Sequence, residues 1–87
     1  MSVEVLHKMS VGDQREIQIS YVASGLEDNI TTGLNYIDYV SASPKSVTTS
    51  FYSVKQNEDS SGTASNGTVG TSGLVTGDEF HIIVRGR

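Results

Sequence analysis

Apolar and polar residues alternate along much of this chain, with the period of two that is typical of half-buried β-strands. The clearest example is the segment 15–22, in which Ile17, Ile19 and Tyr21 share one face. Glu16 and the polar residues that follow it occupy the other face. We therefore expect a strand here, with its isoleucine and tyrosine side chains in the core.

The two ends of the chain show the same period. Near the start, Val3, Val5 and His7 fall on one face, and the segment 11–13 predicts a turn after this first strand. Near the end, the segment 79–85 predicts a closing strand. Three of its apolar side chains are expected to point inward, namely Phe80, Ile82 and Val84.

The segments 30–40 and 46–55 predict two middle strands, separated by the single proline, Pro44. Proline has no N–H to donate, so we expect strand pairing to stop there. Both middle strands carry bulky apolar residues on both faces, which a sheet with one solvated face does not require.

Polar and small residues dominate the segment 56–67, which predicts a long exposed loop or a mobile hairpin tip. A short strand follows at 68–71. Six or seven short strands without a convincing helix indicate an all-β fold, a small immunoglobulin-like β-sandwich of antiparallel strands. We expect one domain covering residues 1–87, and a β-barrel is the structural alternative.

Composition narrows the function. The chain has no cysteine, which excludes disulfides, zinc–thiolate sites and thiol catalysis, and its formal net charge of −4 disfavours nucleic-acid binding. No apolar run is long enough to span a membrane, and the N-terminus lacks the pattern of a signal peptide, so we expect synthesis in the cytoplasm.

Candidate catalytic or metal-binding residues are few. His7 and His81 could approach each other between the first and last strands, but no motif supplies a third metal ligand. Three acidic doublets, at 27–28, 58–59 and 78–79, are expected to be solvated carboxylates in turns. We expect no enzymatic activity, no cofactor and no metal ion.

The tyrosines and their neighbours are more informative. We expect an aromatic and aliphatic patch that one small core cannot enclose, formed by Tyr36, Ile37, Tyr39, Tyr52 and Ile83. Tyrosine is enriched at protein–protein interfaces, and a small domain gains stability when a partner buries more of its surface. The alternative is that loops cover both faces of the sheets.

Two parts of the chain resemble known families. The segment 74–80 runs Leu-Val-Thr-Gly-Asp-Glu-Phe and resembles the turn before the penultimate strand of fibronectin-type and other immunoglobulin-like domains, with Phe80 where those domains carry tyrosine. The segments 15–21, 26–30 and 80–87 together resemble small immunoglobulin-like virion proteins of tailed bacteriophages. This likeness covers roughly half of the chain, and the segment 33–36 lacks the tryptophan usual in that family.

The resemblance implies a structural virion protein, such as a capsid decoration, head fibre or tail-associated protein. Its expected partners are other copies of itself, as a homo-oligomer, and capsid or tail proteins, with no nucleic acid and no membrane. Its expected location is the virion, after synthesis in the host cytoplasm. The alternative function is a carbohydrate-binding β-sandwich that uses exposed tyrosines as stacking platforms.

Overall fold

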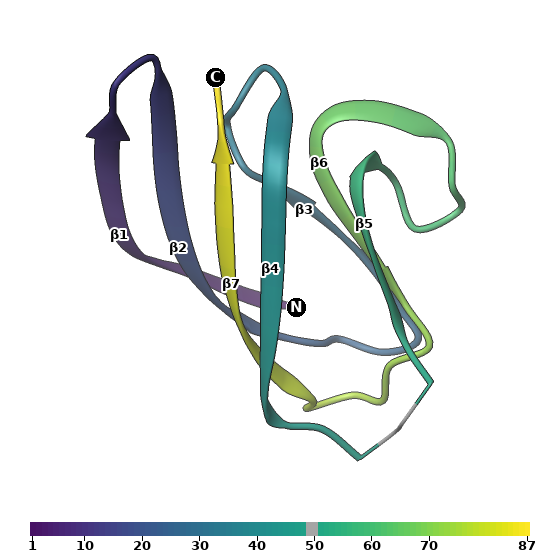
Figure 1. Cartoon of the computed structure of the whole chain (residues 1–87). Coiled ribbons are helices and arrows are strands. Elements are labelled where there is room, and N and C mark those ends of the chain that lie inside the picture. Colours follow the sequence, from purple (N-terminus) through teal and green to yellow (C-terminus); the bar gives the residue numbers. More distant parts are fainter. Residues whose placement is uncertain (49–50) are drawn as a thin grey trace.

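The computed structural model describes residues 1–48 and 51–87, in which seven β-strands are formed (Figure 1). The strands are β1 (Ser2–Val11), β2 (Gln14–Val22), β3 (Glu27–Thr31), β4 (Ile37–Ser46), β5 (Ser53–Glu58), β6 (Ala64–Ser72) and β7 (Glu79–Gly86). The described residues contain no helix that is long and apolar enough to cross a membrane.

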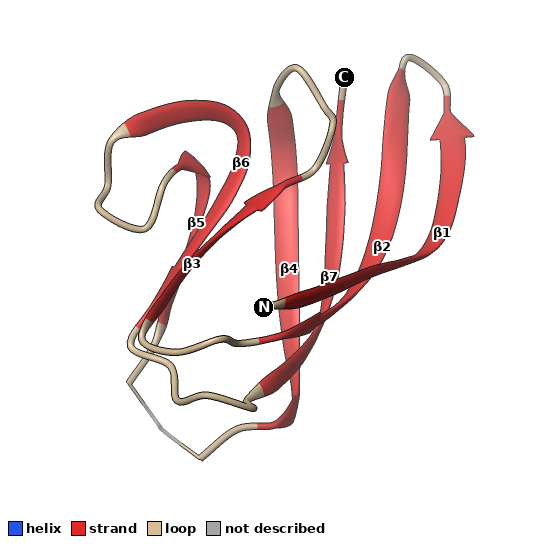
Figure 2. Ribbon diagram, turned by 180° about the vertical axis from the view of Figure 1, so that it is seen from behind, coloured by secondary structure: helices blue, strands red, loops and turns tan. Residues whose placement is uncertain are grey.

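Two antiparallel sheets pack face to face. The first sheet has four strands in the order β1-β2-β7-β4, and the second has three in the order β3-β6-β5. Figure 2 shows the two layers from behind, with the smaller sheet on one side of the larger one. The predicted all-β sandwich of antiparallel strands is therefore confirmed.

The core lies between the sheets and follows the alternation in the sequence. On β2 and β7, Ile17 faces Val84, Ile19 faces Ile82 and Tyr21 faces Phe80 across the pair. The buried apolar residues that complete the core come mainly from the second sheet and the connections: Ala23, Ile30, Leu34, Ile37, Val69 and Leu74. The inward direction predicted for the side chains of β2 and β7 is confirmed.

The strand predicted over residues 30–40 is wrong, because the chain changes sheets within it. β3 ends at Thr31, and β4 begins at Ile37 in the other sheet. Gly33 lies between them with a φ of 84°, in the left-handed region that favours glycine. An alternation pattern cannot reveal such a crossing, since both flanking segments remain extended.

The expectation that pairing stops at Pro44 is also wrong. β4 continues to Ser46, and Pro44 is paired with Phe80 of β7. A proline is tolerated here because β4 is at the edge of the first sheet. The strand predicted over 46–55 is replaced by the end of β4 and the start of β5, and part of that segment lies outside the described residues.

The loop predicted over residues 56–67 is much shorter, because β5 extends to Glu58 and β6 begins at Ala64. The tip is ordered by polar groups rather than by apolar burial: the Asp59 carboxylate accepts hydrogen bonds from the N–H groups of Ser61 and Thr63. This is the local bonding that makes aspartate favourable in turns.

The strand order differs in one respect from that of an immunoglobulin constant-type domain, whose order is 1-2-5-4 in one sheet and 3-6-7 in the other. Here β7 lies between β2 and β4, and β5 pairs with β6, so β5 and β7 exchange places. The pairing of β2 with β7 and of β3 with β6 corresponds to a long hairpin rolled across two sheets, as in jelly-roll sandwiches.

Candidate functional site

The five residues expected to form one interface patch lie in different parts of the molecule. Ile37 is completely buried in the core, which corrects its assignment to an exposed surface. Tyr39 is opposite Arg85 and Ile83 is two residues before Arg85 on β7, so Tyr39 and Ile83 are diagonal neighbours on the outer face of the first sheet. These two residues are the only members of the set brought together in this way.

The other two tyrosines lie at opposite ends of the sandwich. Tyr36 exchanges backbone hydrogen bonds with Arg87 at the end of the chain, and its side chain is exposed. Tyr52 packs edge-on against Phe80, with ring centroids 5.0 Å apart. Residues 80 and 87 are separated by roughly 20 Å of extended backbone, at about 3.3 Å per residue. A single aromatic patch is therefore not formed.

Exposed apolar side chains gather instead at the start of the chain. Of the eleven exposed large hydrophobic residues described, five belong to β1 and the residue before it. We call these five the β1 surface: Met1, Val3, Val5, Leu6 and Met9. No other described element exposes as many, so the β1 surface is the first candidate for a protein contact.

The position of β1 explains this exposure. It is the edge strand of the four-stranded sheet and pairs only with β2, so the opposite edge of β1 has no neighbouring strand in the described chain. The second sheet has one strand fewer and leaves β1 uncovered. The register shifts between Val5 and His7, and Leu6 at this bulge has no cross-strand partner.

Sequence reasoning assigned β1 correctly as a strand but did not identify it as a contact surface. The available signal was the same two-faced apolar pattern that drew attention to the middle strands, since Val5 and Leu6 are adjacent apolar residues in an alternating segment. The local sequence pattern cannot show whether a strand lies at the edge of its sheet, or whether the other sheet packs over it. Both depend on the order and number of strands in the two sheets.

A buried polar cluster joins the two sheets. The Tyr21 hydroxyl donates a hydrogen bond of 2.6 Å to the Asp28 carboxylate and lies 2.8 Å from the Thr71 hydroxyl. Burial and the neighbouring Asp28 raise the pKa of the Tyr21 hydroxyl well above its ordinary value of 10.0. Burial opposes ionisation of Asp28, but the hydrogen bonds from Ser24 and Tyr21 outweigh it and lower the pKa of Asp28 below 3.8.

Asp78 organises the same end of the core, because its backbone carbonyl accepts a hydrogen bond from the N–H of Ala23, two residues after Tyr21. Its carboxylate accepts hydrogen bonds from the N–H of Val75 and from both the N–H and the hydroxyl of Thr48. The Val75 bond in particular lowers the pKa of Asp78 below 3.8, against the effect of burial. The expectation that the acidic doublets are solvated is wrong for Asp28 and Asp78, which are buried structural groups.

The histidines do not form a site. His7 is paired with Gln18 and His81 with Ser20, so the strand β2 separates the two side chains. Among the described residues, no three His, Cys, Asp or Glu side chains are grouped so that they could hold a metal ion. The buried Tyr21–Asp28 pair has its hydrogen bonds satisfied inside the core and does not line the cleft beside the turn of the first hairpin.

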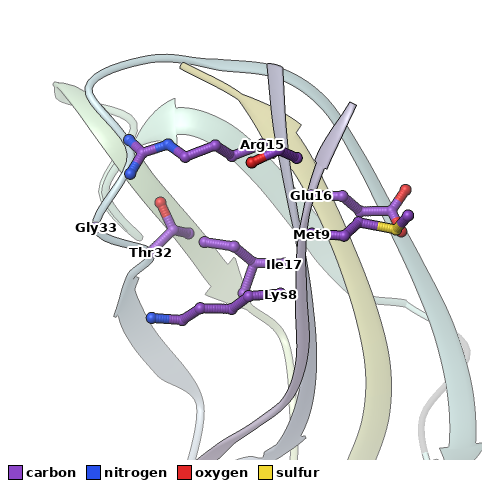
Figure 3. Close-up of a pocket in the computed structure, with 8 residues that line it drawn as sticks. Lys8, Met9, Arg15, Glu16, Ile17, Thr32 and Gly33 are labelled. Carbon is purple, nitrogen blue, oxygen red and sulfur yellow. The ribbon is translucent and has the colours of Figure 1, made fainter. Parts of the chain in front are cut away.

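A cleft of about 290 Å³ opens at the end of the sandwich, beside the turn of the first hairpin. Lys8, Arg15 and Ile17 line it on the hairpin side, and Thr32 and Gly33 line it on the side of the β3–β4 loop (Figure 3). The Thr32 hydroxyl donates to the carbonyl of Gly67 and accepts from the N–H of Leu34. These two bonds hold the loop wall of the cleft in place.

Comparison with known proteins adds no identification. No family model, curated protein sequence or solved structure matches this chain. Two surface features are candidate sites: the β1 surface, and the cleft that Lys8 and Arg15 line.

Proposed function

We propose that this protein is a non-enzymatic structural protein that acts by assembling with other protein surfaces. The observation that carries the proposal is the β1 surface, an exposed apolar strand at an open sheet edge. Natural proteins usually cover or charge such edges, because an uncovered edge pairs readily with other chains. β1 carries a bulge and two charged residues, Glu4 and Lys8, but together with Met1 it still exposes five apolar side chains, which favours a role in which a partner covers it.

The bulge at Leu6 shapes the expected contact. A bulge twists an edge strand and interrupts its row of unpaired N–H and C=O groups. A partner strand can therefore pair continuously either before the bulge or after it, but not across it. We therefore expect the contact to combine edge pairing along residues 2–5 with burial of Leu6 and Met9. Complete burial of each exposed apolar side chain contributes at most about 1.5–3 kcal/mol.

The assignment to a virion rests on the sequence resemblance to small virion proteins of tailed bacteriophages, in the segments 15–21, 26–30 and 80–87. Under this proposal the protein is a capsid decoration, head fibre or tail-associated component, and its partners are other copies of itself and capsid or tail proteins. Tyr39 and Ile83, on the outer face of the first sheet, supply a second and smaller contact area.

Light scattering after size-exclusion chromatography tests the assembly over a wide range of protein concentration. We expect association that increases with concentration and is weakened at least tenfold by Leu6→Lys, which places a charge in the contact. Leu26→Lys is the matched control, because Leu26 is also exposed but lies outside β1. It should associate like the unmodified chain.

A protein that remains monomeric at every concentration and does not sediment with phage capsids would contradict the proposal. The virion assignment has its own test, which is the position of the reading frame in its genome. A location among capsid and tail genes supports this assignment, and a location among metabolic genes argues against it.

A further inference from the structure

The cleft brings together two cationic side chains that have no anionic partner among the residues that the structure describes. Lys8 is paired with Ile17 across the first hairpin, and Arg15 is two residues before Ile17 on β2. Lys8 and Arg15 therefore project from the same face as diagonal neighbours, with their backbones about 7–8 Å apart. Figure 3 shows both side chains on the side of the hairpin that faces Thr32 and Gly33.

This arrangement is unusual for a chain with a formal net charge of −4. Arg85 pairs with Glu16 and Arg87 with Asp38, whereas Lys8 and Arg15 make no ion pair with any described residue. Glu16 also borders the cleft, but its carboxylate is bound by Arg85, and Figure 3 shows it on the other side of the hairpin. Neighbouring charges of like sign destabilise a sheet, and an anion between them would remove that cost.

We propose that this cleft binds a small ligand through an oxyanion group of the phosphate or sulfate type. The guanidinium of Arg15 can donate two parallel hydrogen bonds to such a group, and the ammonium of Lys8 adds a compact positive charge. The N–H of Gly33 has no hydrogen-bond partner in the described chain and is a further donor on the opposite wall.

The dimensions of the cleft favour a small ligand. Its volume of about 290 Å³ is near the lower end, about 300 Å³, of the usual range for small-molecule sites. Ile17 also borders the cleft, but its side chain is almost fully buried in the core, so the oxyanion is the main group that the cleft can recognise. The proposal does not require the assembly proposed above, because Lys8 and Arg15 project from the inner face of the hairpin, although Met9 belongs both to the β1 surface and to the lining of the cleft.

Titration followed by amide chemical shifts in NMR tests the site, with inorganic phosphate, inorganic sulfate, glucose 6-phosphate and glucose as probes. We expect saturable shifts for the three anions, centred on residues 8–17 and 32–34, and none for glucose. Lys8→Gln and Arg15→Gln should each weaken binding of phosphate about tenfold, as expected for the loss of a hydrogen bond to a charged group.

Lys45→Gln is the matched control. It removes the same charge from an exposed lysine of β4. Lys45 is next to Ser46, which pairs with Glu79 at the start of β7. Glu79 is roughly 17 Å along β7 from Val84, the partner of the cleft residue Ile17. This variant should leave phosphate affinity unchanged. Tighter binding of glucose 6-phosphate than of phosphate would place a sugar in the cleft, and equal binding would limit the site to the oxyanion. Shifts that do not saturate, or an equal loss of affinity in all three variants, would overturn the proposal.

Discussion

Tyr21 connects the two sheets through a hydrogen bond as well as through packing. Its ring lies in the core beside Phe80, and its hydroxyl reaches Asp28 and Thr71 of the second sheet. A buried polar group is costly unless its hydrogen bonds are satisfied, so this cluster specifies how the sheets face each other as well as how closely they pack.

Tyr21→Phe should lower the free energy of unfolding by about 1–3 kcal/mol, because the Asp28 carboxylate and the Thr71 hydroxyl lose a buried partner. Urea denaturation followed by circular dichroism measures the change. Tyr39→Phe is the control, since the Tyr39 side chain is exposed, and it should change stability by less than about 0.5 kcal/mol. Equal effects of the two variants would show that the Tyr21 hydroxyl does not stabilise the fold.

Acid should destabilise the protein through Asp28 and Asp78. Both carboxyl groups have a pKa below the ordinary 3.8 in the folded protein, so between their folded and unfolded pKa values the unfolded chain binds more protons. Their contribution is complete above about pH 5 and is lost as the pH falls through the folded values. Urea denaturation at a series of pH values should show the free energy of unfolding decreasing below about pH 4. A profile that stays flat between pH 5 and pH 3 would contradict the hydrogen bonds assigned to these carboxylates.

The β5–β6 hairpin shows how an element poor in apolar residues becomes ordered. Asn57 has a φ of 58°, and its side-chain amide bonds both the N–H and the carbonyl of Ile37, at 2.9 and 2.7 Å. The same side chain accepts a hydrogen bond from the N–H of Gly67. One asparagine therefore attaches the hairpin to the start of β4.

Asn57→Gly should destabilise the fold by about 1–3 kcal/mol, because the N–H of Ile37 loses its side-chain partner and its carbonyl keeps only the longer bond from Gln56, while the local conformation is kept. Asn57→Ala should be worse by about 1 kcal/mol, since alanine is strained at this positive φ. Thermal or urea unfolding distinguishes the two variants. If alanine proved no worse than glycine, the left-handed conformation of Asn57 would not be a source of strain.

At the scale of the whole molecule, the unequal size of the two sheets decides which surface is available. The first sheet has four strands and the second has three. The second sheet does not cover β1, and β1 supplies no residue to the buried core. The central strands β2, β7 and β6 each have a neighbour on both sides and carry most of the core residues. The stability of the fold should therefore be uneven across the molecule.

Hydrogen exchange under dilute, monomeric conditions should show this unevenness. We expect the amides of β1 that pair with β2 to exchange by local opening, and those of β2 and β7 to exchange only with global unfolding. Raising the protein concentration should slow exchange in β1 if the proposed assembly covers this strand. Equal protection of β1 and β7 in the monomer would contradict the peripheral role of β1.

The fold class could be predicted from the sequence because alternation is a local property. Ile17, Ile19 and Tyr21 on β2, and Phe80, Ile82 and Val84 on β7, lie in the core as the pattern predicted. The candidate site could not be predicted in the same way. Ile37 resembled its exposed neighbours in the sequence, but the crossing at Gly33 carries it into the interior.

The sequence by itself determined an acidic, cysteine-free chain of short alternating strands, and therefore an all-β fold, for which a sandwich was predicted and a barrel was the alternative. The tertiary structure alone decided that β7 lies beside β2, that β1 is left at an open edge, and that Lys8 and Arg15 share a cleft with Thr32 and Gly33. The physical reason is that burial and strand pairing depend on residues far apart in the chain, whereas a period of two records only the two faces of each strand.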